Sequence, residues 1–340
     1  MEKLKVLELF GGIGACSKAL KKLGINYEIT DYVEIDKYAV KSFNAIHNTN
    51  FEPQDITTWD KNIDVDLIMH GSPCQDFSLA GSQAGGDEGS GTRSSLMYET
   101  IRIVEKLKPK YVIWENVKNV ISKKHKHNFD NYLNKMEELG YTNYYQVLNA
   151  KDYGIPQNRE RVFTISIRND IKKDFVFLPK QELKLKLKDM LEDKVDEKYY
   201  LSEKMMNYVL DNNETQKGTK WEGRVDNDTL NSNIAHTLSV RGAGGSQRAG
   251  VSNFIVDDYD DEIKVKELKL KINNSNDAMG AIINDLRIRK LTPKECWRLM
   301  GFDDEDFEKA EKVNSNTQLY KQAGNSIVVN VLMAIFKELL

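Results

Sequence analysis

Apolar runs of strand length alternate with helical patterns through the first half of the chain, and this alternation constrains the fold more than any other feature. Strands separated by helices at this spacing predict a parallel β-sheet with helices on both faces, which is an α/β fold. The expected strands are 6–10, 27–33, 65–69, 111–114, 144–148 and 162–167. The expected helices are 15–23, 37–47, 96–107 and 129–139.

The alternation stops near residue 170, and the next part of the chain has a different character. Charged residues dominate 180–200, polar sequence with many asparagines fills 212–233, and a glycine-rich stretch covers 241–250. Helical patterns return at 292–300 and 326–340. We therefore expect a main domain at 1–170, a smaller irregular domain at 171–286, and a C-terminal return at 287–340 that completes the main domain.

The composition favours a soluble, cytoplasmic protein. With 340 residues, 40% of them hydrophobic, the chain can bury a full core. Its three cysteines, Cys16, Cys74 and Cys296, have no paired spacing, which argues for a reducing compartment and against a disulfide framework or a zinc site. No secretory or membrane-spanning segment is expected. The net charge of −3 does not exclude a cationic cleft, because 118–127 and 287–298 are locally basic.

Cys74 stands just after the expected strand at 65–69, within the sequence His-Gly-Ser-Pro-Cys-Gln-Asp-Phe-Ser of residues 70–78. A nucleophile at the carboxyl end of a strand lies where open α/β sheets carry their chemistry. The alternative is a small buried core residue. A free thiol is mostly protonated at neutral pH, so a nucleophilic role requires a cationic or helix-end environment. His70 gives no clear Cys–His protease pair, and no second cysteine supports a thiol oxidoreductase.

Glu115 occupies the carboxyl end of the expected strand at 111–114, and we expect it to share an edge of the sheet with Cys74. A carboxyl group there can protonate or hydrogen-bond a ring nitrogen, which is the work of a general acid. Arg159 and Arg161 flank Glu160 at the start of the strand at 162–167, so the two arginines share one face. Two arginines leading into a buried strand favour a site for anions over a plain surface pair.

Residues 9–14, Leu-Phe-Gly-Gly-Ile-Gly, follow the first strand and precede the first helix. Glycines at this point let the backbone approach a ligand, although the spacing lacks the full dinucleotide pattern. Glu34 ends the second strand, where an acid can accept from ribose hydroxyls. Asp55 is placed to take an adenine amino group and Ile56 to cover the ring. Together they favour an adenosine-containing ligand over a set of surface or capping carboxylates.

Taken in order, these blocks resemble the DNA (cytosine-5)-methyltransferase family. The resemblance covers 4–168 and 287–340 and is most specific in the Pro-Cys, Glu-Asn-Val and Gln-x-Arg-x-Arg blocks. The blocks that carry it are residues 10–14, Glu34, Asp55-Ile56, 71–75 with 77–78, 115–117, 157–161, 289–302 and 322–326. It implies a Rossmann-like S-adenosylmethionine-dependent methyltransferase domain with a smaller irregular target-recognition domain at 171–286.

The resemblance also implies the chemistry. Cys74 attacks carbon 6 of a flipped-out cytosine in double-stranded DNA, and Glu115 holds ring nitrogen 3 and the exocyclic amine. Arg161 faces the carbonyl oxygen of the base or the thiol, and Arg159 lies near sugar or phosphate. The group that removes the carbon 5 proton is not identified. The residues implied around S-adenosylmethionine are Phe10, Gly12, Gly14, Glu34, Ile35, Asp55, Ile56, Pro73, Leu96, Asn325 and Ser326.

Contacts with DNA are expected from two regions. The loop at 78–95, rich in Gly and Ser, would close over DNA with Arg93 on a phosphate, and Gln75 and Ser78 would lie near the vacated base position. In the second domain Thr237-Leu238 resembles the Thr-Leu pair of the family's recognition region. The residues with the chemistry to read base edges are Arg241, Gln247 and Arg248, although a flexible surface loop is equally compatible with them.

Two alternatives remain open at this point: an RNA cytosine-5 methyltransferase acting on tRNA, and a catalytically silent DNA-binding regulator. A monomer is expected, since a flipped base requires only one subunit. The DNA target sequence cannot be read from the chain. Membership of a restriction-modification system, with a cognate restriction endonuclease as partner, is left open.

Overall fold

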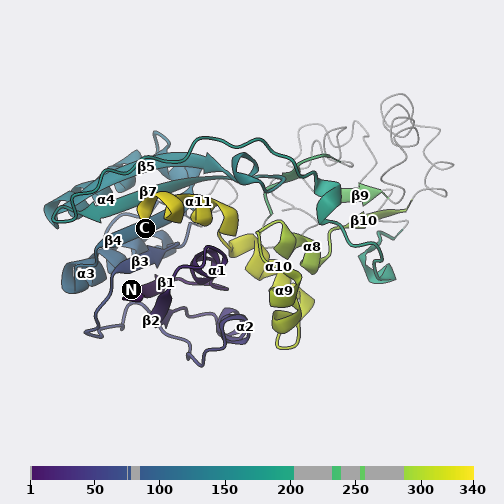
Figure 1. Cartoon of the computed structure of the whole chain (residues 1–340), viewed down its shortest axis with the longest axis horizontal. Coiled ribbons are helices and arrows are strands. Elements are labelled where there is room, and N and C mark those ends of the chain that lie inside the picture. Colours follow the sequence, from purple (N-terminus) through teal and green to yellow (C-terminus); the bar gives the residue numbers. More distant parts are fainter. Residues whose placement is uncertain (1, 75, 78–84, 203–231, 239–252, 257–286) are drawn as a thin grey trace.

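The computed structural model describes residues 2–74, 76–77, 85–202, 232–238, 253–256 and 287–340. Within these residues a six-stranded sheet has the strand order β2-β1-β3-β4-β7-β5 (Figure 1). Its strands are β1 (Leu4–Leu9), β2 (Tyr27–Val33), β3 (Leu67–His70), β4 (Tyr111–Val117), β5 (Tyr141–Asn149) and β7 (Glu160–Arg168). Two short pairs lie outside this sheet: β6 (Gln157–Asn158) with β8 (Ala235–His236), and β9 (Phe254–Val256) with β10 (Ile288–Lys290).

The sheet is mostly parallel, and the predicted α/β class is confirmed. β1 pairs in parallel with β2 and β3, and β3 pairs in parallel with β4. β7, however, runs antiparallel to both β4 and β5, so the prediction of an all-parallel sheet is wrong at this end. The connection from β5 to β7 holds only the short η3 (Ala150–Tyr153) and β6, whereas a parallel crossover needs a dozen or more residues and usually a helix.

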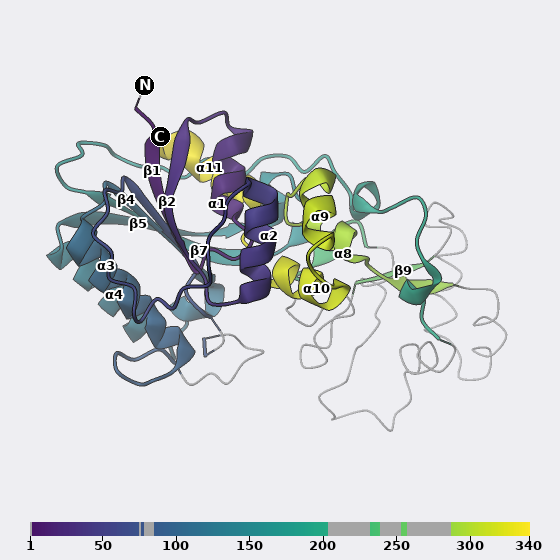
Figure 2. The ribbon, with the colours of Figure 1, turned by 90° about the horizontal axis from the view of Figure 1, so that it is seen from below.

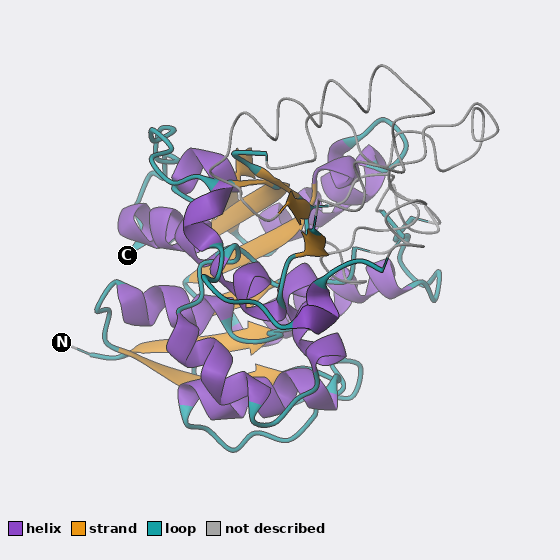
Figure 3. Ribbon diagram, turned by 90° about the vertical axis from the view of Figure 1, so that its right-hand side faces the viewer, coloured by secondary structure: helices purple, strands orange, loops and turns teal. Residues whose placement is uncertain are grey.

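Helices cover both faces of the sheet, as predicted, and Figure 3 shows the strands lying between them. Successive strand residues point to opposite faces, so Val6 belongs to one buried cluster and Leu7 to the other. Helices α1 and α11 pack on the first face, and α3 and α4 pack on the second (Figure 2). These helices are α1 (Ala15–Lys22), α3 (Met97–Leu107), α4 (Lys126–Glu138) and α11 (Val329–Leu339), and α2 (Lys37–His47) follows β2.

The last part of the chain returns to the first part. Asn314 and Gln322 both donate to the carbonyl of Tyr38 in α2, at 2.9 and 3.0 Å. Lys18 of α1 forms 2.6 Å ion pairs with Asp303 and Asp306. These contacts attach α8 (Pro293–Arg298), α9 (Asp304–Glu311), α10 (Asn316–Asn325) and α11 to the sheet domain. The domain boundaries near residues 170 and 287 stay a prediction.

A buried ion pair anchors the start of this return. Arg289 and Glu295 are 4% and 0% exposed, and their side chains form two hydrogen bonds of 2.9 Å. Thr292 and Glu295 cap the start of α8 reciprocally, which fixes the carboxylate. Glu295 also accepts from the backbone amide of Glu192 at 3.0 Å, so the pair joins α8 to the chain that leaves the sheet domain. In the described part of the chain, no helix combines the length and apolarity needed to cross a membrane.

Candidate active site

The register of the sheet brings the predicted reactive residues to one edge. Leu9 at the end of β1 lies opposite His70 at the end of β3, and His70 lies opposite Trp114 in β4. The glycine turn after β1, the Cys74 segment after β3 and Glu115 near the end of β4 therefore share the carboxyl edge of the parallel strands. Because β7 is antiparallel, its first residues lie at this same edge, with Arg161 opposite Val117.

The segment that carries Cys74 is held by side chains of β4. The indole of Trp114 donates to Ser72 Oγ at 2.9 Å, and Asn116 Nδ2 donates to the Ser72 carbonyl at 3.3 Å. Beyond the cysteine, the amide of Phe77 donates to the Cys74 carbonyl at 3.0 Å and closes a turn. Cys74 is partly exposed, whereas Cys16 and Cys296 are buried. The thiol of Cys74 is thus fixed on a braced turn at the sheet edge.

Glu115 and Arg161 form the central ion pair of this edge. Arg161 Nε lies 3.1 Å from Glu115 Oε1, and the two residues are diagonal neighbours on one face of the β4–β7 ladder. The other carboxylate oxygen faces Gly71, where an added Cβ would lie 3.7 Å from it. Burial raises the pKa of Glu115 above its ordinary value, while Arg161 and Arg159 oppose that shift. A raised pKa makes it easier for a carboxyl group to take up a proton and pass it to a bound base.

The protein groups around Cys74 do not activate its thiol. Burial raises its pKa above the ordinary value, Glu115 adds to the rise, and the positive charges of Arg161 and Arg159 lower it. The thiol therefore stays protonated at neutral pH, with the two guanidinium groups limiting the cost of losing the proton. His70 does not serve as a base for it, because its Nε2 lies 2.9 Å from the Tyr132 hydroxyl and burial lowers its pKa to about 3.

Arg159 lies inside the protein, and its place near a sugar or phosphate stays a prediction. It is 4% exposed, and its guanidinium donates to three backbone carbonyls, those of Leu238 (3.1 Å), Gly324 (3.0 Å) and Ser326 (2.9 Å). Burial lowers its pKa to about 9, which leaves it charged at neutral pH. It acts on Cys74 and Glu115 through its charge from inside the protein.

The glycine turn after β1 is shaped for a close approach from outside. Gly12 has φ +55° and a Cβ built there would meet no atom within 4 Å, so this residue faces open space. Gly14 has φ +81° and its missing Cβ makes room for His47 and Phe43. Glu34 Oε2 accepts from the amide of Gly12 at 3.2 Å, and burial raises the pKa of Glu34. The turn and the acid at the end of β2 therefore form one structural unit.

The other predicted cofactor residues differ in their accessibility. The side chain of Ile35 is 68% exposed, which is unusual for an isoleucine that packs only against protein. Ile56 is 5% exposed and packs in the core, and its role as a cover over a ring stays a prediction. Asp55 is exposed and accepts from the amide of Thr57 at 2.9 Å. Partly or fully exposed residues are Phe10, Pro73, Leu96 and Asn325, and Ser326 is buried.

Five of the predicted DNA contacts lie outside the described residues: Gln75, Ser78, Arg241, Gln247 and Arg248. Of the predicted closing loop, 78–84 is likewise not described, and Arg93 is exposed at the start of η1 (Arg93–Leu96). Thr237 is exposed and its hydroxyl donates to the Asn158 carbonyl at 2.6 Å. Leu238 is 3% exposed with both backbone groups hydrogen-bonded, and its contact with DNA stays a prediction.

The sequence did not predict three features of this edge. Gln157 lies in a block that carries the resemblance, but no role was predicted for its side chain. Ser72 and Asn116 brace the cysteine turn. Lys123 and Lys124 are exposed in the turn between η2 (Lys118–Ile121) and α4. That turn lies near the cysteine segment, because Asn119 Nδ2 donates to the Phe77 carbonyl at 2.6 Å. The basic stretch at 118–127 was the signal for these lysines.

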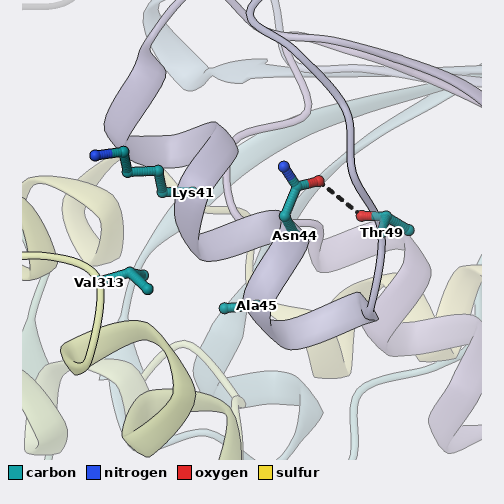
Figure 4. A pocket seen from close by; sticks show the side chains of 5 residues that line it. All are labelled: Lys41, Asn44, Ala45, Thr49 and Val313. Carbon is teal, nitrogen blue, oxygen red and sulfur yellow. Dashed lines mark hydrogen bonds between the residues drawn. The ribbon is translucent and has the colours of Figure 1, made fainter.

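A hollow elsewhere on the molecule does not compete with this edge. It lies over α2 and is lined by Lys41, Asn44, Ala45, Thr49 and Val313 (Figure 4). The Thr49 hydroxyl donates to Asn44 Oδ1 at 2.8 Å, so these two polar groups of the hollow already bind each other. It contains no cysteine and no acid among its lining residues, and none of them is a predicted site residue.

Comparison with known proteins gives consistent matches along the whole chain. Residues 4–340 match the family model described as C-5 cytosine-specific DNA methylase. The Type II methyltransferase M2.ScrFI of Lactococcus lactis subsp. cremoris is 36% identical, with 99% of each chain covered. The Orphan methyltransferase M.SPRI of Bacillus phage SPR is 35% identical over 100% of this chain and 98% of the relative. Among solved structures, a DNMT2 mutant of Spodoptera frugiperda superposes with a TM-score of 0.75 at 23% identity, covering 99% of each chain.

Alkylation of Cys74 tests the electrostatics of the edge. We expect its rate with iodoacetamide to rise with pH around a midpoint above the ordinary thiol value near 8.5, because burial raises the thiol pKa. Arg161→Met removes a cation and moves the midpoint higher, whereas Glu115→Gln removes an anion and moves it lower. Peptide mass spectrometry follows Cys74 separately from the buried Cys16 and Cys296. A wild-type midpoint below 8, or shifts of the opposite sign, would contradict this account.

Proposed function

The chain belongs to the C-5 cytosine-specific DNA methylase family and is a DNA cytosine-5 methyltransferase, and from that premise we propose that its reaction passes through a covalent adduct between Cys74 and a flipped-out cytosine. One observation carries the proposal. A partly exposed thiol, a carboxyl group with a raised pKa and a guanidinium paired to that carboxyl lie together at the carboxyl edge of the sheet. No other part of the described chain combines these groups.

Covalent attack answers a chemical difficulty, because carbon 5 of cytosine is a weak nucleophile. The Cys74 thiol loses its proton to solvent and its sulfur bonds to carbon 6, which moves the electron pair of the 5,6 double bond to carbon 5. Glu115 takes up a proton from solvent as the base binds and passes it to ring nitrogen 3, which accommodates the charge that the attack places on the ring. Arg161, held at 3.1 Å by Glu115, is directed toward the carbonyl oxygen of the same base.

S-adenosylmethionine, the methyl donor of this family, would supply its sulfonium methyl group to carbon 5, with cleavage of the methyl–sulfur bond and S-adenosylhomocysteine as the leaving group. Once carbon 5 carries the methyl group, a base removes its proton and the 5,6 double bond reforms. The bond between carbon 6 and the Cys74 sulfur breaks, nitrogen 3 returns its proton to Glu115, and the thiolate is released. The base that takes the carbon 5 proton is not among the groups we assign. Flipping the cytosine out of the duplex gives Cys74 access to a carbon otherwise hidden in the stack.

The residues at the glycine turn fit the methyl donor. Gly12 leaves open space beside a backbone turn, and Glu34 ends β2 where an acid can accept from ribose hydroxyls. Ile35 offers an exposed apolar side chain to an adenine ring. Phe10, Pro73, Leu96 and Asn325 are accessible there, and Ile56 packs in the core and is proposed to border the adenine ring.

The proposed substrate is double-stranded DNA, bound by a monomer whose sheet domain includes 1–170 and 287–340 and whose target-recognition domain includes 171–286. The exposed Lys123 and Lys124 near the cysteine segment support approach of a phosphate backbone from this edge. The names of the relatives include both type II and orphan methyltransferases, so a cognate restriction endonuclease and a cytoplasmic restriction-modification system stay predictions.

Methyl transfer from labelled S-adenosylmethionine to unmethylated plasmid DNA tests this function, with tRNA assayed in parallel. We expect label in plasmid cytosines within one short motif, mapped by bisulfite sequencing, and none in tRNA. Cys74→Ala should reduce the rate of methyl transfer by at least about 10³-fold, because the variant has no nucleophile to form the covalent adduct. It should still bind duplex DNA. Label in tRNA alone would replace the DNA substrate with RNA. Undiminished transfer by Cys74→Ala would remove the covalent mechanism.

Substitution of Gly12 tests the cofactor site against a matched control. Gly12 and Gly24 both have positive φ angles and open space around a built Cβ, so alanine at either position costs about 1 kcal/mol of folding free energy from backbone strain. Only Gly12 borders the proposed site. We expect Gly12→Ala to weaken S-adenosylmethionine binding at least tenfold by calorimetry, and Gly24→Ala to leave it unchanged. Equal affinities in the two variants would show that the donor binds elsewhere.

A further inference from the structure

The backbone of Leu238 is held on both sides by two side chains of one short segment. Gln157 Oε1 accepts from the amide of Leu238 at 3.3 Å, and Arg159 Nη1 donates to its carbonyl at 3.1 Å. Gln157 is 0% exposed and Arg159 is 4% exposed, so both bonds are shielded from water. We call these two residues the clamp. Because the clamp binds only the backbone of Leu238, its hydrogen bonds do not depend on which side chain stands at position 238.

The far ends of the clamp reach two other segments. Gln157 Nε2 donates to the Leu299 carbonyl at the end of α8, at 2.8 Å. Arg159 Nη2 donates to the carbonyls of Gly324 and Ser326, in the turn that leads from α10 to α11. That turn carries Asn325 and Ser326, both proposed near the methyl donor. The clamp thus joins Leu238 to the α8 end and to the cofactor side of the sheet domain.

Backbone contacts align the residues just before Leu238 with the same segment. The amide of Ala235 donates to the Pro156 carbonyl at 2.8 Å, and β8 pairs in parallel with β6. The Thr237 hydroxyl adds its bond to the Asn158 carbonyl. Residues 235–238 are therefore fixed against a strand that continues, through Arg159, into Arg161 at the reactive edge.

The chemistry of Arg159 suits a residue that connects several backbone carbonyls better than one that only fills the core. Among the described residues no carboxylate lies within ion-pair distance of it, and its Nε has no hydrogen-bond partner. A buried charge without a paired anion is costly, and a neutral side chain would avoid that cost. A planar guanidinium, however, can reach carbonyls on opposite sides at once, which the single ammonium of a lysine cannot do.

We propose that Gln157 and Arg159 are positioning residues that hold the Thr237–Leu238 segment in register with the methyl-donor site and the Cys74 edge, so that correct base reading and methyl transfer are aligned. This inference rests on the proposed DNA substrate and extends it to sequence discrimination. A loosened clamp would leave the reactive groups in place but would let the recognition segment shift against them. The loss should therefore fall mainly on discrimination between target and altered duplexes.

The test compares wild type, Arg159→Lys and the matched control Arg168→Lys, which alters a partly exposed arginine at the other end of β7. Once the target motif is mapped, kcat/KM is measured on a target duplex and on duplexes with one base pair changed. We expect Arg159→Lys to reduce the ratio of these values at least tenfold, mainly through slower transfer on the target. Arg168→Lys should keep the wild-type ratio. Melting temperature and S-adenosylmethionine affinity are measured for each variant.

A residue with a purely structural role would lower the rates on all duplexes alike and leave the ratio intact, and that result would overturn the proposal. If Arg159→Lys does not fold, Gln157→Met removes the hydrogen bonds of Gln157 to Leu238, Leu299 and the Met300 sulfur with little change in side-chain size, and the same tenfold loss of discrimination is expected. Failure of both variants to fold would make the clamp ordinary core structure and also overturn it. Absence of any methylation by wild type would instead reject the proposed function.

Discussion

The ion pair between Glu115 and Arg161 depends on the one strand of the sheet that runs antiparallel to its neighbours. β7 begins with residues 160 and 161, so in a parallel sheet Arg161 would lie at the amino edge, a full strand length from Cys74. The antiparallel direction brings it to the carboxyl edge, diagonally across from Glu115. The whole reactive group, including the effect of both arginines on the Cys74 thiol, depends on this reversal.

The sequence predicted where most strands and helices lie, but it did not predict the direction of β7. Alternating apolar runs predicted β1 to β4 and the helices around them, because local periodicity reflects burial on two faces. The sequence also placed Cys74 and Glu115 at strand ends, where parallel strands share an edge. The direction of β7 depends instead on the length and path of its connection from β5, and no local pattern reports it. The resemblance placed Arg161 near the base although an all-parallel sheet would have put it at the wrong edge.

Arg159 shows a second limit of the sequence. Two arginines two residues apart suggested a site for anions, and in the structure Arg161 pairs with a carboxylate while Arg159 donates to the carbonyls of Leu238 and the 324–326 turn. Its partners are remote in the chain, so only the folded structure could identify them. Ile35 and Ile56 make the same point for the cofactor site. Both are isoleucines in the same predicted role, and tertiary packing leaves Ile35 exposed while it buries Ile56.

The central claim is that Cys74 bonds to the target base with Glu115 as acid, and covalent trapping tests it most directly. Duplex DNA in which 5-fluorocytosine replaces every cytosine contains the target motif whatever its sequence, and fluorine at carbon 5 leaves no proton to remove, so the adduct cannot break down. With S-adenosylmethionine present, we expect a denaturation-stable complex for wild type, none for Cys74→Ala, and much slower formation for Glu115→Gln. Peptide mapping should place the base on Cys74. A complex formed without Cys74, or no complex from an enzyme that methylates ordinary DNA, would contradict the account.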